Sequence, residues 1–133
     1  MIIINNNLVP FGKFDCMNIL GILFVKNNTK LPQYIINHEA IHTSQQYEIL
    51  LLSLFIALIV SNIYASWWYL LISVIMPIFI YVLVWFVELI LPPYSSAYKD
   101  SPFEREAYLN QTKDSYLTTR PLFAWVKYWL IHR

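Results

Sequence analysis

The middle of the chain consists of two long apolar segments, and these constrain the fold more than any other feature. Ile49 to Val60 contains no charged residue, and Ser53 is its only polar side chain. Trp67 to Leu91 carries a single charged residue, Glu88, near its end. A helix of about 20 residues crosses the roughly 30 Å hydrocarbon core of a bilayer. We therefore expect a two-helix transmembrane hairpin, provided that the first segment continues the helix before it.

The composition agrees with a membrane environment. The residues AVILMFWYC make up 58% of the chain and DEKR only 13%, whereas about 25% of the residues in soluble domains are charged. The net charge of +1 provides no field that would attract nucleic acid. A length of 133 residues suits one domain. The sequence thus predicts a single membrane-embedded domain over residues 1–133, with the lipid bilayer as a partner and no nucleic acid.

The predicted fold class is mainly α, a helical membrane protein with a small N-terminal β-hairpin within residues 1–30. A motif helix should begin at Pro32, because proline suits a first helical turn, and continue over 32–62 into the first membrane helix. The second membrane helix is expected over 67–92, with a bend at Pro77.

Residues 101–133 are predicted to form a second polar helix and a tail. Ser101 is placed as an N-cap, proline follows at the first helical position, and Glu104 stands third, which is the capping-box arrangement. The tail over 121–131 carries aromatic and aliphatic side chains on most faces. We expect it to lie along the bilayer surface as an interfacial helix.

The positive charges predict the orientation in the membrane. All of them lie outside the hairpin and none in its turn: Lys13, Lys26, Lys30, Lys99, Arg105, Lys113, Arg120, Lys127 and Arg133. The positive-inside rule then places both termini in the cytoplasm. We expect an integral protein of the inner or plasma membrane, with the polar segments that flank the hairpin on its cytoplasmic face.

The motif helix carries the pattern His38-Glu39-Ala40-Ile41-His42, which has the His-Glu-x-x-His spacing. Residues four apart share one helical face, so both imidazoles can reach one ion. Zinc with three protein ligands keeps a position for water, and an adjacent carboxylate, here Glu39, can act as the general base. Cys16 is the only cysteine, so a cysteine-rich metal site is excluded and any metal must use histidine and carboxylate ligands.

The third ligand is expected on the helix after the hairpin, because the hairpin returns that segment to the same membrane face. Glu104 and Glu106 both lie there, and Glu106 stays open as the substitute ligand. Glu48 on the motif helix is disfavoured, because no glycine follows His42 to turn the chain back. A solvated helix start with acids that suit the helix dipole is the structural alternative for this segment.

The motif and the segments that follow it resemble those of a known protein family. The HEAIH motif, a hairpin and a later Glu-x-x-Ala segment are similar to the gluzincin metallopeptidases, within them the integral-membrane type related to CAAX-processing and quality-control proteases. That resemblance implies a Zn²⁺-dependent hydrolase of peptide or protein substrates. It implies His38, His42 and Glu104 as metal ligands, with Ala107 at the alanine of the motif. Tyr108 stands where the family has aspartate, a departure that affects the support of a histidine.

Other polar residues near the motif have less defined roles. Tyr108, Tyr116 and Arg120 could stabilise the oxyanion of a tetrahedral intermediate, and anchoring at the bilayer surface is the alternative for the tyrosines. The polar residues that continue the motif helix either form its solvent-exposed face or support the ligands or substrate; they are Gln45, Gln46 and Glu48.

Three functions follow from these patterns. The first is a zinc metallopeptidase with Glu39 as its catalytic base. The second is a non-catalytic membrane zinc-binding or scaffold protein with a zincin-like site, and the replacement of aspartate by Tyr108 favours it. The third is a small membrane protein that binds no metal, in which the motif is accidental.

Overall fold

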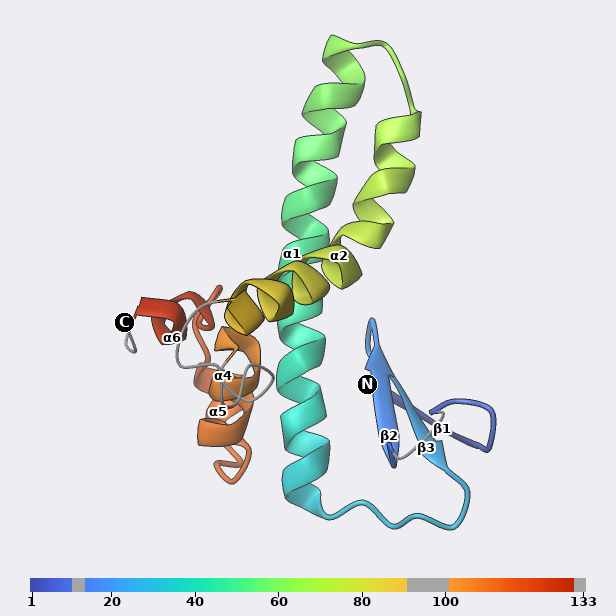
Figure 1. The fold of residues 1–133 in the computed structure, drawn as a ribbon, viewed down its shortest axis with the longest axis vertical. Helices are drawn as coiled ribbons and strands as arrows, with labels where there is room; N and C mark the ends of the chain where they lie inside the picture. Colours follow the sequence, from blue (N-terminus) through green and yellow to red (C-terminus); the bar gives the residue numbers. More distant parts are fainter. Residues whose placement is uncertain (11–13, 91–100, 131–133) are drawn as a thin grey trace.

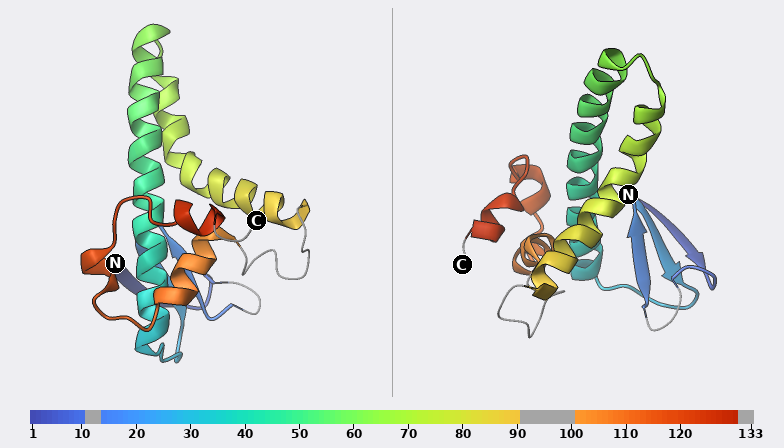
Figure 2. Two further views of the ribbon diagram at one scale, coloured as in Figure 1. Left: turned by 90° about the vertical axis from the view of Figure 1, so that its left-hand side faces the viewer. Right: turned by 45° about the horizontal axis from the view of Figure 1, so that its top comes forward.

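The computed structural model describes residues 1–10, 14–90 and 101–130. One long helix forms its axis, a small sheet lies against one side of that helix, and short C-terminal helices lie against another (Figures 1 and 2). In chain order the elements are β1 (Ile2–Asn6), β2 (Cys16–Ile19), β3 (Ile22–Lys26), α1 (Gln33–Ile63), α2 (Trp68–Ile90), α4 (Pro102–Asn110), α5 (Tyr116–Thr119) and α6 (Val126–Leu130).

The sheet contains the predicted hairpin and one further strand. Its order is β1-β3-β2, with β2 antiparallel and β1 parallel to β3. Leu20 and Gly21 form the tight turn of the hairpin, and both have positive φ, +47° and +82°, which a two-residue turn of this hand requires. The expectation of a hairpin alone was therefore incomplete. The strand β1 pairs with residues some twenty positions away, and no local pattern indicates such a partner.

Side-chain hydrogen bonds attach the sheet to α1. Asn18 donates to the Glu39 carbonyl and, over 2.9 Å, to the Thr43 hydroxyl. The Gln46 amide accepts from the Leu20 N–H at 2.5 Å and donates to the Asn18 carbonyl at 3.3 Å. The Gln46 side chain therefore bonds both a backbone N–H and a backbone carbonyl of the β2–β3 hairpin. These bonds hold the hairpin beside α1.

The helix α1 runs without a break from Gln33 to Ile63, so one helix carries both the motif and the first apolar segment. It is long and apolar enough to cross a membrane, by length and composition. Its apolar half exposes large side chains, among them Leu51 (65%), Phe55 (62%) and Ile63 (69%). In α2, the apolar stretch Trp68–Val84 is shorter. Over the described residues α1 alone meets the length for a membrane span, and a two-helix membrane hairpin stays a prediction.

The helix α2 packs along α1, bends partway and crosses it (Figure 1). We attribute the bend to Pro77, which lies inside the helix and is buried. Proline has no N–H, so the carbonyl four residues earlier, on Ser73, lacks its helical donor. The Ser53 hydroxyl on α1 donates to that carbonyl over 3.0 Å. A neighbouring helix thus satisfies the group that the proline leaves open.

The C-terminal segment begins as the sequence predicts. The Ser101 hydroxyl accepts from the Glu104 N–H at 3.3 Å, and proline occupies the first turn of α4. An interfacial helix was expected over 121–131; of the described residues in that range, 121–130, only α6 (Val126–Leu130) is helical. That segment also packs against α4, with Ala124 and Tyr128 buried. One of its faces therefore contacts protein.

The main apolar core lies where α1, α2 and α4 meet. Ile49, Val84 and Phe103 are its buried members. Partly buried side chains surround them, namely Ile80, Tyr81 and Trp125. Because this core joins the apolar half of α1 to α4, it fixes the position of α4 beside the motif.

The last residues of the predicted ranges 67–92 and 101–133 lie outside the described part of the chain.

Candidate metal centre

The two motif histidines face one another across a single turn of α1. Their residues are four apart, and their Nε2 atoms lie 3.0 Å from each other. His38 is 7% exposed and His42 is 6% exposed. Both are buried because α4 covers this face of α1 and the ring of Tyr81 on α2 lies edge-on to His42, with centroids 6.0 Å apart.

Glu104 on α4 completes a cluster with the histidines. Its Oε2 lies 3.3 Å from the His38 Nε2, and its Oε1 lies 3.4 Å from the His42 Nε2. The carboxylate is buried, and these three residues form a group that could hold a metal ion. Ligands about 2.0–2.1 Å from a tetrahedral zinc are separated by about 3.3 Å. The two Nε2 atoms and the carboxylate oxygen nearest to each lie close to that spacing, and one donor atom from each residue can be chosen within 4.8 Å of the other two, so the cluster could hold a metal ion.

The second nitrogen of each imidazole faces an amide oxygen. His42 Nδ1 lies 2.8 Å from the Gln45 Oε1, and His38 Nδ1 lies 3.1 Å from the Gln111 Oε1. An amide oxygen only accepts, so each Nδ1 carries a proton and the Nε2 of each ring is the atom directed at the cluster. Two imidazole Nε2 atoms and a carboxylate therefore converge, which are the donor groups that a metal cation would bind.

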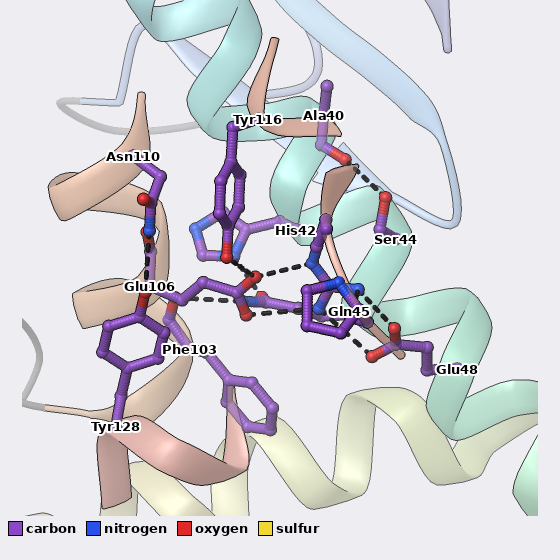
Figure 3. Close-up of polar contacts among 12 residues, drawn as sticks. Ala40, His42, Ser44, Gln45, Glu48, Phe103, Glu106, Asn110, Tyr116 and Tyr128 are labelled. Atoms are coloured by element: carbon purple, nitrogen blue, oxygen red, sulfur yellow. Dashed lines mark hydrogen bonds and ion pairs between the residues drawn. The ribbon is translucent and has the colours of Figure 1, made fainter. Parts of the chain in front are cut away.

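A network of buried hydrogen bonds fixes the orientation of the Gln45 amide (Figure 3). Its Nε2 donates to the Phe103 carbonyl at 3.1 Å and to the Glu106 Oε2 at 2.9 Å. The Tyr81 hydroxyl donates to its Oε1 at 2.6 Å. Because nitrogen and oxygen have different partners, the amide has one favoured orientation, with its oxygen toward His42. Gln45 is completely buried and supports a ligand from behind.

Glu106 points away from the histidines into an ion-pair network. It is completely buried, and its carboxylate accepts from the Arg120 Nε at 2.6 Å and the Tyr116 hydroxyl at 2.8 Å. Arg120 also forms a two-pronged ion pair with Glu48. The guanidinium thus joins α1 to α4 through two carboxylates. Of the three carboxylates considered as third ligand, Glu104 is the one beside both histidines.

Arg120 and Tyr116 are engaged in this network, which leaves Tyr108 as the oxyanion candidate at the centre. Burial alone would lower the pKa of Arg120, but hydrogen bonds to Glu48 and Glu106 raise it. Burial and the bond to Glu106 also raise the pKa of Tyr116. The ring of Tyr108 lies edge-on to His38, with centroids 4.7 Å apart. Burial and the Glu104 carboxylate raise the Tyr108 pKa, so its hydroxyl stays a hydrogen-bond donor.

Glu39 lies between two cavities beside the cluster. The first, which we call the metal-side cavity, has a volume of about 270 Å³ and includes Glu39, His42 and Glu104 in its wall. The second, the polar cavity, measures about 510 Å³ and includes Glu39, His38 and Tyr108. Glu39 is partly exposed, unlike the three buried residues of the cluster. Its carboxylate is therefore accessible to water from the two cavities.

Cys16 on β2 contacts the carboxylate of Glu39. Its thiol donates to the Glu39 Oε1 over 3.6 Å. Burial, and next the negative charge of Glu39, raise the pKa of this thiol to about 12. Cys16 therefore stays protonated and acts as a weak hydrogen-bond donor at the mouth of the site.

Several residues of the centre were absent from the predictions. Gln111 lies against His38 and Tyr81 against Gln45, and the sequence patterns predicted a role for neither. Gln111 follows Glu104 by two helical turns, a spacing that places both on one face of a helix and could have identified it. Tyr81 and Cys16 come from distant elements, and no local pattern indicates them.

No protein-family model, curated protein or solved structure matches this chain. The geometry of the centre therefore carries the functional argument.

Proposed function

We propose that the protein is a zinc-dependent peptidase at the membrane surface, with His38, His42 and Glu104 as ligands and Glu39 as the general base. The observation that carries the proposal is the convergence of three buried metal-binding side chains, which offer donor atoms within 4.8 Å of one another. When bound, zinc supplies Lewis acidity, which lowers the pKa of a water molecule and polarises a carbonyl group.

The residues around the ion position support hydrolysis rather than a closed structural site. Three protein ligands leave a fourth position, which is typical of catalytic zinc. Glu39 borders both cavities and can accept the proton of a water molecule in the metal-side cavity. The Tyr108 hydroxyl lies on the polar-cavity side and can donate to the oxygen of a substrate carbonyl.

Cleavage of a peptide mixture by the full chain in detergent, followed by mass spectrometry, tests the proposal. We expect zinc-loaded wild type to cleave, and Glu39→Gln to retain zinc while losing about 10²- to 10⁴-fold in rate. Asp114→Asn is the matched control, an exposed carboxylate that becomes an amide away from the cavities. Equal cleavage by wild type and Glu39→Gln would contradict the proposal.

The second candidate is a non-catalytic metal-binding protein. The observation that favours it is that neutral amides, those of Gln45 and Gln111, support both histidines where carboxylates often do. The same experiment separates the two functions. Stoichiometric zinc without cleavage of any peptide supports the second candidate, whereas a chain without metal supports an accidental motif.

We also propose that α1 and α2 cross the membrane together and that the metal centre lies on the cytoplasmic face. The exposed apolar side chains of α1 favour lipid contact. Positive charges lie in the segments that flank the two helices, at Lys26, Lys30 and Arg120, whereas the turn between the helices carries none. The positive-inside rule then places the flanking segments, and the metal centre with them, on the cytoplasmic face. In a Cys16→Ser background, a membrane-impermeant thiol reagent applied to intact cells should label Ser66→Cys and leave Ser115→Cys unlabelled. The reverse result would contradict this orientation.

A further inference from the structure

A third cavity extends the site toward the apolar half of the molecule. It measures about 260 Å³ and lies between the β2–β3 turn and the bend of α2. Its wall is apolar, with contributions from Met17, Ile19, Leu20, Pro77, Ile78 and Val82. We call it the apolar cavity.

The apolar cavity adjoins the metal-side cavity. The two share four lining residues, Met17, Asn18, Gln46 and Tyr81. The metal-side cavity in turn shares Phe14, Cys16 and Glu39 with the polar cavity. The three cavities therefore form a row, and a single extended ligand could pass Glu39 and reach both ends.

The row follows α1 from its polar end toward its apolar half. The polar cavity is lined by residues near the start of α1, such as Tyr34 and His38. The apolar cavity meets α1 at Gln46, just before the last charged residue of the helix, Glu48. If α1 enters a membrane, the apolar cavity is the end of the row that lies nearest to the lipid.

We propose that the apolar cavity binds one bulky apolar side chain of a peptide substrate, on the membrane side of the bond that is cleaved. This inference rests on the proposed peptidase function. Pockets for whole drug-sized ligands start at about 300 Å³, so the cavity suits a single large side chain. The substrate is thus a peptide segment beside the membrane, with an apolar residue near the cleavage site and polar residues beyond it.

Peptides that differ at one position test the proposal. The probes are quenched-fluorescent peptides with Gly, Ser and Lys flanks and either Phe or Ala at the varied position. An apolar pocket discriminates by about 10- to 200-fold for small differences in side-chain size. We therefore expect wild type to prefer the Phe peptide by at least about tenfold in kcat/KM, and a ratio near one in wild type would overturn the inference.

Two tryptophan variants of α2 locate the preference. Ile78→Trp fills the apolar cavity and should bring the Phe/Ala ratio close to one. Ile75→Trp is the matched control, because Ile75 is similarly exposed on α2 but does not line this cavity. It should keep the wild-type ratio. An unchanged ratio in Ile78→Trp would overturn the inference.

Binding to Glu39→Gln separates this inference from the function on which it rests. Fluorescence anisotropy of the labelled Phe and Ala peptides reports binding without cleavage. Preferential binding of the Phe peptide, lost in the Glu39→Gln, Ile78→Trp double variant, supports the pocket even if wild type hydrolyses nothing. Cleavage without any preference, or binding that is unchanged in the double variant, overturns the pocket and leaves the peptidase function standing.

Discussion

Replacement of Gln45 by methionine tests how the centre holds its ligands. The methionine keeps the length of the side chain but removes the oxygen that lies 2.8 Å from His42 Nδ1. Gln45 is completely buried, so water cannot take the place of the amide. His42 then loses the acceptor that holds its proton on Nδ1 and its lone pair on Nε2.

The size of the effect follows from these contacts. Loss of a group that orients a metal ligand typically lowers metal affinity by about 10- to 100-fold, or roughly 1.4–2.7 kcal/mol. The fold should also lose stability, by about 1–3 kcal/mol, because the Phe103 carbonyl and the Glu106 carboxylate each lose a buried donor. Glu106 keeps its bonds to Arg120 and Tyr116, so we expect the variant to fold.

The assay is competition for zinc between the purified protein and a chelator of known affinity, with circular dichroism to check the fold. Gln111→Met is the matched control, because its oxygen faces His38 at 3.1 Å from a partly exposed position. Water can replace that oxygen, so its loss should cost less than about tenfold in affinity. Wild-type zinc affinity in a folded Gln45→Met variant would refute the reasoning.

Three further predictions concern the surroundings of the centre. Arg120→Met should destabilise the fold by about 3–5 kcal/mol, measured by unfolding in detergent, because it leaves two buried carboxylates unpaired; a loss below about 1 kcal/mol would mean that the ion pairs are not formed. Ser53→Ala should lower the free energy of unfolding by about 0.6–1.7 kcal/mol when Pro77 is present. The loss should be much smaller in a Pro77→Ala background, because the backbone N–H of residue 77 can then donate to the Ser73 carbonyl. Equal losses in the two backgrounds would contradict the hydrogen bond from Ser53 to that carbonyl. Alkylation of Cys16 by iodoacetamide should be slow at neutral pH, because its pKa is about 12, and faster in Glu39→Gln, which removes the neighbouring charge; an unchanged rate would separate the thiol from that carboxylate.

The sequence predicted the parts of the centre that depend on local spacing. His38 and His42 share a face because they are four residues apart on one helix. Glu104 begins α4 because Ser101 and the proline after it start a helix there. The motif helix and the apolar segment form one helix because neither glycine nor proline interrupts them.

Features that depend on long-range pairing were not predictable in the same way. Glu104 and Glu106 are both acids on one short helix, and the direction in which α4 faces α1 decides between them. Contacts between distant parts of the chain hold that direction, among them the packing of Ile49 and Phe103 in one core and the pairing of Arg120 with Glu48 across 72 positions. The parallel strand β1 was missed for the same reason, because the strand β2 lies between it and its partner β3 in the sequence.

The zinc content of the purified full chain, together with its X-ray absorption spectrum, tests the central claim most directly. We expect one zinc per chain, bound by two nitrogen ligands and carboxylate oxygen at about 2.0–2.2 Å. Zinc should be lost in His38→Ala and in Glu104→Ala and retained in Glu39→Gln. A wild-type chain without zinc, or both ligand variants with wild-type zinc content, would contradict the account.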